Sequence, residues 1–162
     1  MTEMLVIDDL INSIPLMNIN GIDFKVKFDF GNINNLQEFV TINKGKQIYP
    51  LIYCPTDYKL SFDKDTRLYS GDLTFVVATA NQDKNMSNKE RLKTSFNLVI
   101  KPLVKDFIDK LKYGGYVSVN GELFNEYNYY GYDIGKEYSD NIGLNEYWDA
   151  YKFTINLSFK RC

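Results

Sequence analysis

The chain has 162 residues, of which 44% are hydrophobic, 15% aromatic and 25% charged. This composition excludes a disordered tail, a collagen-like fibre and a membrane-embedded chain, and the length suits a single domain spanning 1–162. The net charge is -2, so no overall positive field attracts nucleic acid or anionic lipid. The chain contains no histidine, which removes the commonest general base and metal ligand. We therefore expect no enzymatic activity.

The first third of the chain alternates between helical and extended patterns. Apolar residues at helical spacing predict a helix over 3–13. Strict alternation of apolar and polar residues predicts a half-exposed strand over 22–30. A capping-box pattern predicts a short helix over 35–43. The segment 47–55 has a proline near each end, so we expect a short strand at an edge of the sheet or an interrupted one.

The middle of the chain contains a polar arm, a buried strand and a long helix. Segment 56–71 is polar and rich in turn residues, which predicts a long connection or an extended hairpin arm. Segment 72–80 is almost continuously apolar, as in a central strand. A capping box at 87–90 begins a helix that keeps its apolar spacing as far as Leu111. Pro102 lies inside this helix, and we expect a kink or a break there.

The last part of the chain ends in a second alternating strand. Residues 116–120 indicate a weak strand, and 121–147 form an irregular insertion rich in tyrosine and glycine. Alternation over 150–160 predicts a half-buried antiparallel strand. Strands separated by helices of unequal length favour an α+β fold. We expect a mostly antiparallel, twisted sheet with the long helix packed on one face and a further helix at the N-terminus.

The acidic residues form no convincing catalytic or metal site. The run 63–65 resembles the start of a calcium loop, but the required glycine and the final acidic residue are missing in either register. Glu122 with Glu126, or Asp133 with Glu137, have the residue types of a hydrolytic carboxylate pair. Spacing in an irregular segment does not place two carboxylates at a working separation. Solvated loops are the simpler interpretation of both features.

The two cysteines do not support catalysis or a metal centre. Cys54 lies in an apolar run without a histidine partner, and Cys162 is the last residue of the sequence. Phosphate-binding and nucleotide-binding glycine motifs are absent from the sequence. We therefore expect reduced thiols and no metal or cofactor.

The densest aromatic run lies at 127–132, with four tyrosines. Tyrosines of this kind anchor protein interfaces, stack on sugars or stack on bases. Acidic rather than basic residues flank the run. We therefore place a protein interface or local packing first, sugar binding second and nucleic-acid binding last.

Several segments, taken in order, resemble one family of proteins. They are residues 45–53, 73–79, Arg91 with 101–103 and 107–111, Tyr130–Gly131, 147–153 and 160–162. The series is similar to small structural proteins of tailed bacteriophages, of the tail-completion or tail-terminator kind. In particular it resembles those of phages that infect AT-rich gut bacteria of the Bacteroides type. The resemblance covers about 45–162, and residues 1–44 agree only in the order of their elements.

The resemblance implies a virion structural protein that forms a homo-oligomeric ring at the head–tail connector or tail. Its expected partners are other copies of itself, portal-side or connector-side proteins and tail proteins, with DNA only as passing cargo and no membrane. The expected location is the virion, after synthesis in the host cytoplasm. The candidate interface residues lie in the arm and in the aromatic run: Asp63, Asp65, Arg67, Tyr69, Tyr127, Tyr129, Tyr130 and Tyr132.

Two other functions remain open on the sequence alone. A small protein-binding or glycan-binding module would use the tyrosines of 127–132 and would be a monomer with a concave aromatic patch. A cation-dependent hydrolase would need at least three carboxylates converging on one cleft. The absence of histidine makes the hydrolase the least favoured of the three.

Overall fold

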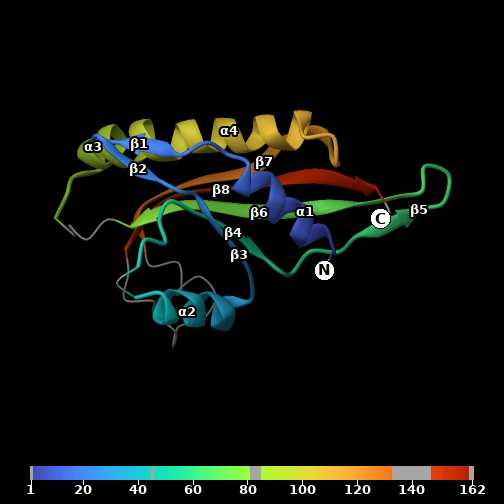
Figure 1. Cartoon of the computed structure of the whole chain (residues 1–162), viewed down its shortest axis with the longest axis horizontal. Coiled ribbons are helices and arrows are strands. Elements are labelled where there is room, and N and C mark those ends of the chain that lie inside the picture. The colour runs from blue at the N-terminus through green and yellow to red at the C-terminus, as the bar shows by residue number, and fades with distance from the viewer. Residues whose placement is uncertain (1, 45, 81–84, 133–146, 161–162) are drawn as a thin grey trace.

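A computed structural model describes residues 2–44, 46–80, 85–132 and 147–160. Its main sheet has the strand order β3-β4-β6-β8-β7, and β5 pairs with β6 beside this path (Figure 1). The bounds are β3 Lys27–Gly31, β4 Leu51–Pro55, β5 Ser61–Asp63, β6 Leu68–Ala80, β7 Val117–Tyr132 and β8 Trp148–Lys160. The β3–β4 pair is parallel, and the other pairs of this sheet are antiparallel. The expected α+β fold with a mostly antiparallel sheet is therefore confirmed.

A long helical run covers one face of this sheet (Figure 1). It consists of α3 (Asn88–Arg91), the π-helical segment η1 (Leu92–Ile100) and α4 (Lys101–Tyr113). Ser87 and Glu90 form the expected capping box at its start. Helical structure continues past Pro102, so of the two expected outcomes, a kink or a break, the break is wrong. The winding changes here from π-helix to α-helix, since η1 ends two residues before Pro102. The wider π turn that precedes the proline leaves room for its ring.

The larger core lies between this helical run and the sheet. The helix α1 (Thr2–Asn12) adds Met4, Ile7 and Ile11 to it. From the sheet, alternate residues of β6 and β8 point into this core, among them Phe75 and Phe153, which also contact each other. The alternation predicted for 150–160 is therefore confirmed, and β8 begins two residues earlier than expected.

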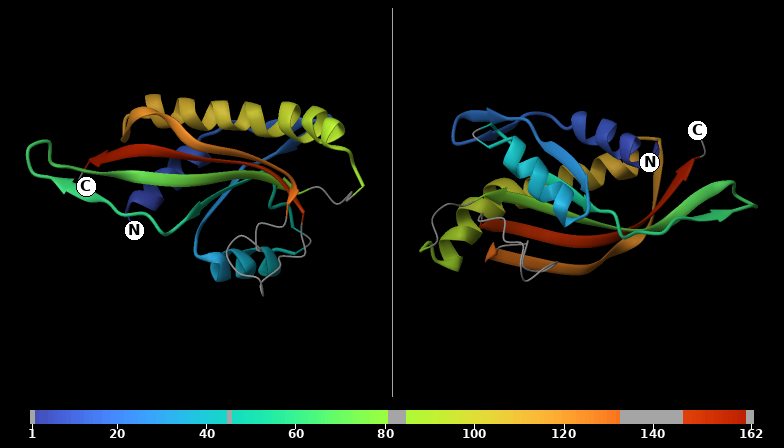
Figure 2. Two further views of the ribbon diagram at one scale, coloured as in Figure 1. Left: turned by 180° about the vertical axis from the view of Figure 1, so that it is seen from behind. Right: turned by 90° about the horizontal axis from the view of Figure 1, so that it is seen from below.

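A second, smaller core lies on the opposite face, under the helix α2 (Ile33–Ile42) (Figures 1 and 2). Leu36 and Val40 of α2 pack with Tyr53 and Trp148 of the sheet. The helix begins earlier than predicted, because Asn32 rather than Asn34 is the N-cap and forms a capping box with Asn35. Helices thus lie on both faces of the sheet.

The strand predicted over 22–30 is two strands instead of one. β2 (Ile22–Phe24) pairs with β1 (Met17–Ile19) in a small separate hairpin, and β3 belongs to the main sheet. Asn20 and Gly21 have φ of 53° and 84°, which suits the tight turn that an Asn-Gly pair favours. Between β2 and β3, Val26 turns into the core.

The strand predicted over 47–55 is not at an edge, since β4 pairs with β3 on one side and β6 on the other. Pro50 precedes β4 and Pro55 is its last residue. Because neither proline lies in the interior of the strand, neither removes a hydrogen-bond donor from the middle of the ladder.

The predicted irregular insertion is in part a strand. β7 extends to Tyr132, whereas residues 133–146 lie outside the described part of the chain. Its pairing with β8 shifts register at three places. Gly121, Asn125 and Gly131 have positive φ values of 81°, 51° and 64°. Gly121 and Gly131 therefore mark irregularities within a long strand.

Candidate interaction surface

The first group of predicted interface residues lies on the hairpin of β5 and β6, which we call the hairpin arm (residues 58–70). It projects at one end of the sheet (Figures 1 and 2). Asp63, Asp65 and Arg67 are exposed at its tip. The Asp63 carboxylate accepts a hydrogen bond from the backbone N–H of Asp65 (2.8 Å), and this bond lowers the pKa of Asp63. The Tyr69 ring contacts Phe62 at 4.9 Å between centroids, so the tip carries an aromatic pair beside two carboxylates.

The second group lies on β7, and its tyrosines divide between the two faces. Tyr127 is exposed, and its ring centroid lies 6.5 Å from that of Tyr129, which packs against the smaller core. Tyr130 packs instead against Phe96 of η1, at 4.7 Å between centroids. Tyr132 is the last residue of β7. Of the described side chains in this run, Tyr127 and Tyr130 are exposed and lie on opposite faces of β7, so the run is a bulged strand and not a single aromatic patch.

The two groups lie at opposite ends of the sheet. Leu68 of β6 pairs with Lys160 at the hairpin end, and Ala80 pairs with Trp148 at the end where Tyr132 lies. Twelve residue steps separate these pairs, which is about 40 Å of extended strand. The structure therefore does not combine the predicted residues into one site.

A groove that the sequence does not predict lies between the helical run and the strands β7 and β8. It has a volume of about 350 Å³. Phe96 and Ile100 are buried beneath it, Val104 and Tyr151 are half-buried, and Lys101, Lys105 and Asn128 are exposed around it. The apolar members were identified from the sequence only as core residues. The only indication of the groove in the sequence is the pair Lys101 and Lys105, which lie one helical turn apart beside the apolar stripe.

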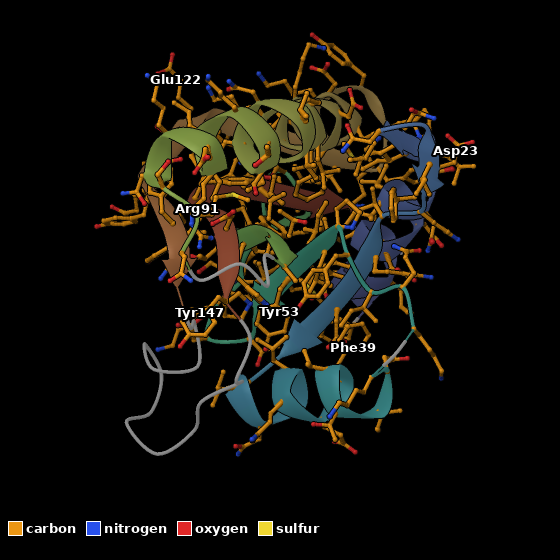
Figure 3. The ribbon with its side chains drawn as sticks, turned by 90° about the vertical axis from the view of Figure 1, so that its left-hand side faces the viewer. Asp23, Phe39, Tyr53, Arg91, Glu122 and Tyr147 are labelled. Carbon is orange, nitrogen blue, oxygen red and sulfur yellow. The ribbon has the colours of Figure 1, made fainter. Side chains whose placement is uncertain are left out.

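A buried polar cluster joins the helical run to β7 and β8. The Arg91 guanidinium donates to Asp149 at 2.8 Å, and these residues are only 3% and 0% exposed (Figure 3 labels Arg91). Asp149 also accepts from the Ser95 hydroxyl at 2.5 Å and from the backbone N–H of Gly131 at 2.8 Å. The sequence indicates this cluster only in that two polar residues, Arg91 and Ser95, lie one turn apart on the apolar side of the helix.

Three of the remaining candidates for chemistry lie in described strands, Cys54 on β4 and Glu122 and Glu126 on β7. Burial raises the pKa of the Cys54 thiol far above its ordinary value, so this cysteine is unsuited to nucleophilic attack. Glu126 accepts a hydrogen bond from the Tyr151 hydroxyl, whereas Glu122 is exposed on β7. Asp133 and Glu137 lie outside the described residues.

Two further features are absent from the described residues. No group of three or more aspartate, glutamate or cysteine side chains in the described ranges is placed to hold a metal ion. Within the same part of the chain, none of the helices is sufficiently long and apolar to cross a membrane.

Comparison of the sequence with protein-family models and with curated proteins found no match. The surfaces described above are therefore the basis for assigning a function.

Proposed function

We propose that this chain is a structural subunit of a bacteriophage virion that forms a homo-oligomeric ring in the head–tail connector or tail, with a tail-completion or tail-terminator role. In this role the protein performs no reaction. It contacts portal-side or connector-side proteins and tail proteins on the two faces of the ring, while DNA only passes through. The place of the protein is then the virion, after synthesis in the host cytoplasm.

The observation that carries this proposal is the separation of the two candidate surfaces. A ring needs a heterologous contact, in which one surface of each copy meets a different surface of the next. The hairpin arm and the part of β7 around Tyr127 offer two unlike surfaces. Leu68 pairs with Lys160 and Tyr127 with Lys152, which lie eight residues, or about 25 Å, apart on β8. Exposed aromatic rings at both places, Phe62 on the arm and Tyr127 on β7, are of the type that anchors protein interfaces.

Trimming the hairpin arm tests the proposal. Ser61 and Ser70 are cross-strand partners, so replacing 62–69 by Asn-Gly closes the hairpin earlier and spares Tyr58 and Leu60, which pack on the core. We expect the full chain to form rings and the trimmed chain to be a folded monomer, as measured by light scattering and circular dichroism. Rings of unchanged size from the trimmed chain would exclude the arm from the ring contact. A monomeric full chain would instead favour a binding module.

A further inference from the structure

The groove between the helical run and the strands β7 and β8 has the properties of a binding site for a protein segment. We propose that it binds the hairpin arm of a second copy of this chain, with Phe62 entering the groove and the tip carboxylates meeting Lys101 and Lys105. This inference rests on the proposed function, and it places the surface that receives the arm in the groove beside β7 rather than at the exposed Tyr127.

The groove offers an apolar base with cations on one side. Phe96, Ile100, Val104 and Tyr151 supply the apolar surface, in a volume of about 350 Å³ that suits a side chain rather than a domain. Lys101 and Lys105 stand on α4, four residues apart, which is about 6 Å along the helix axis. Their ammonium groups contact Asn97 and Asp109 at 2.9 and 2.7 Å, at exposed positions where both keep room for a further acceptor.

The tip of the hairpin arm has the complementary arrangement. Phe62 is 42% exposed although its ring is large and apolar, and Asp63 follows it directly. All three residues of β5 are exposed, and Asp65 stands in the turn beyond them. One apolar ring next to two carboxylates therefore meets an apolar groove next to two ammonium groups. Such charge pairing fixes the orientation of partners more than it adds affinity.

The two cationic side chains of the arm tip also have an acidic partner near the groove. Lys64 and Arg67 lie in the same turn as the carboxylates. On the strand side of the groove, Glu126 bonds the Tyr151 hydroxyl and remains exposed. The carboxylate of Glu126 is thus available to these cations when the tip approaches the groove.

The position of the groove makes the contact intermolecular and repeatable. Tyr151 lies at the groove, and Lys160 pairs with Leu68 next to the tip of the hairpin arm. These two residues are nine positions apart on β8, which is about 30 Å of strand. The sheet holds this distance, so an arm does not reach the groove of its own chain. Each copy then uses its arm on one neighbour and its groove on the other, which is the head-to-tail pattern of a ring.

Cysteine cross-linking tests the contact directly. We would combine Phe62→Cys with Val104→Cys, in a chain where Cys162→Ser removes the terminal thiol and Cys54 remains buried. Mild oxidation of the assembled protein should join successive copies into a ladder on a non-reducing gel. The matched control pairs Phe62→Cys with Lys112→Cys, an exposed site on the same helix away from the groove. The control should give little product beyond a dimer.

Charge reversal supplies an independent measurement. Lys101→Glu with Lys105→Glu should raise the concentration needed for half-assembly by about tenfold or more. Lys89→Glu with Lys112→Glu changes the net charge equally at exposed sites on the same helical run and should have little effect. Circular dichroism would verify that both variants fold.

The outcomes separate this inference from the proposed function. Multimers of the unmodified chain, with a ladder from the groove pair and weakened assembly after reversal, support both. Multimers without that ladder, and with unchanged assembly after the reversal, overturn the arm-in-groove contact and leave the ring proposal standing. A chain that stays monomeric at every concentration contradicts both.

Discussion

Arg91 and Asp149 show how single residues hold β7 and β8 to the long helical run. Both side chains are buried, and Asp149 accepts hydrogen bonds from three donors on three different elements. Removing one partner of a buried ion pair leaves an uncompensated charge, which costs far more than loss of an exposed pair. The cluster therefore stabilises the region where β7 and β8 lie beside the start of the helical run.

Asp149→Ala tests how much this cluster contributes to the stability of the fold. We expect it to lower the free energy of unfolding by about 3–5 kcal/mol, since it leaves the Arg91 guanidinium buried without its carboxylate. Asp109→Ala is the matched control, because it breaks the exposed Lys105–Asp109 pair and should cost under about 1 kcal/mol. Urea denaturation of the two variants measures both values. Equal small losses would show that the buried pair contributes little.

Asp29 on β3 gives the protein a predictable pH response. Burial raises the pKa of this carboxyl, so its ionised form is less favourable in the folded chain than in the unfolded chain. An unfolded aspartate titrates near pH ~4, so the penalty is absent below that pH and complete once pH exceeds the raised pKa. Asp29→Asn should therefore stabilise the protein at pH 7 and change little below pH ~3. Thermal unfolding at both pH values measures this, and a gain of equal size at the low pH would contradict the account.

At the scale of elements, the sequence predicted those parts whose pattern is local. The alternation over 150–160 and the capping box at Ser87 led to the correct strand and helix start. The same alternation over 22–30 predicted one strand, because it hid a break between β2 and β3 that depends on burying Val26. The irregular insertion predicted over 121–147 is a strand as far as Tyr132, since pairing with a distant strand leaves no local signal.

The irregularities of β7 are testable with two glycines. Gly121 and Gly131 both have positive φ, which costs a residue with a Cβ atom about 1 kcal/mol. A methyl group at Gly121 would meet no atom within 4 Å, whereas one at Gly131 would lie 2.9 Å from Cζ of Arg91. We expect Gly131→Ala to destabilise the protein by at least about 1 kcal/mol more than Gly121→Ala. Similar losses in chemical denaturation would show that the guanidinium moves aside freely.

At the scale of the whole molecule, the candidate site was only partly predictable. Asp63, Asp65 and Tyr127 are candidates from the sequence because polar turns and dense aromatic runs are visible there. The groove was not, because it forms where η1 and α4 pass over β7 and β8, and its residues look like ordinary core in the chain order. Nor did the sequence indicate that the hairpin arm and the tyrosines lie at opposite ends of the sheet.

The central claim is that copies of this chain bind head to tail into a closed ring. The most direct test is the mass of the purified full chain by light scattering over a concentration series, with negative-stain images of the same fractions. We predict a single mass that is an integer multiple of 18.9 kDa, and closed rings in the images. A mass of one chain at every concentration, with no rings in the images, would contradict the claim.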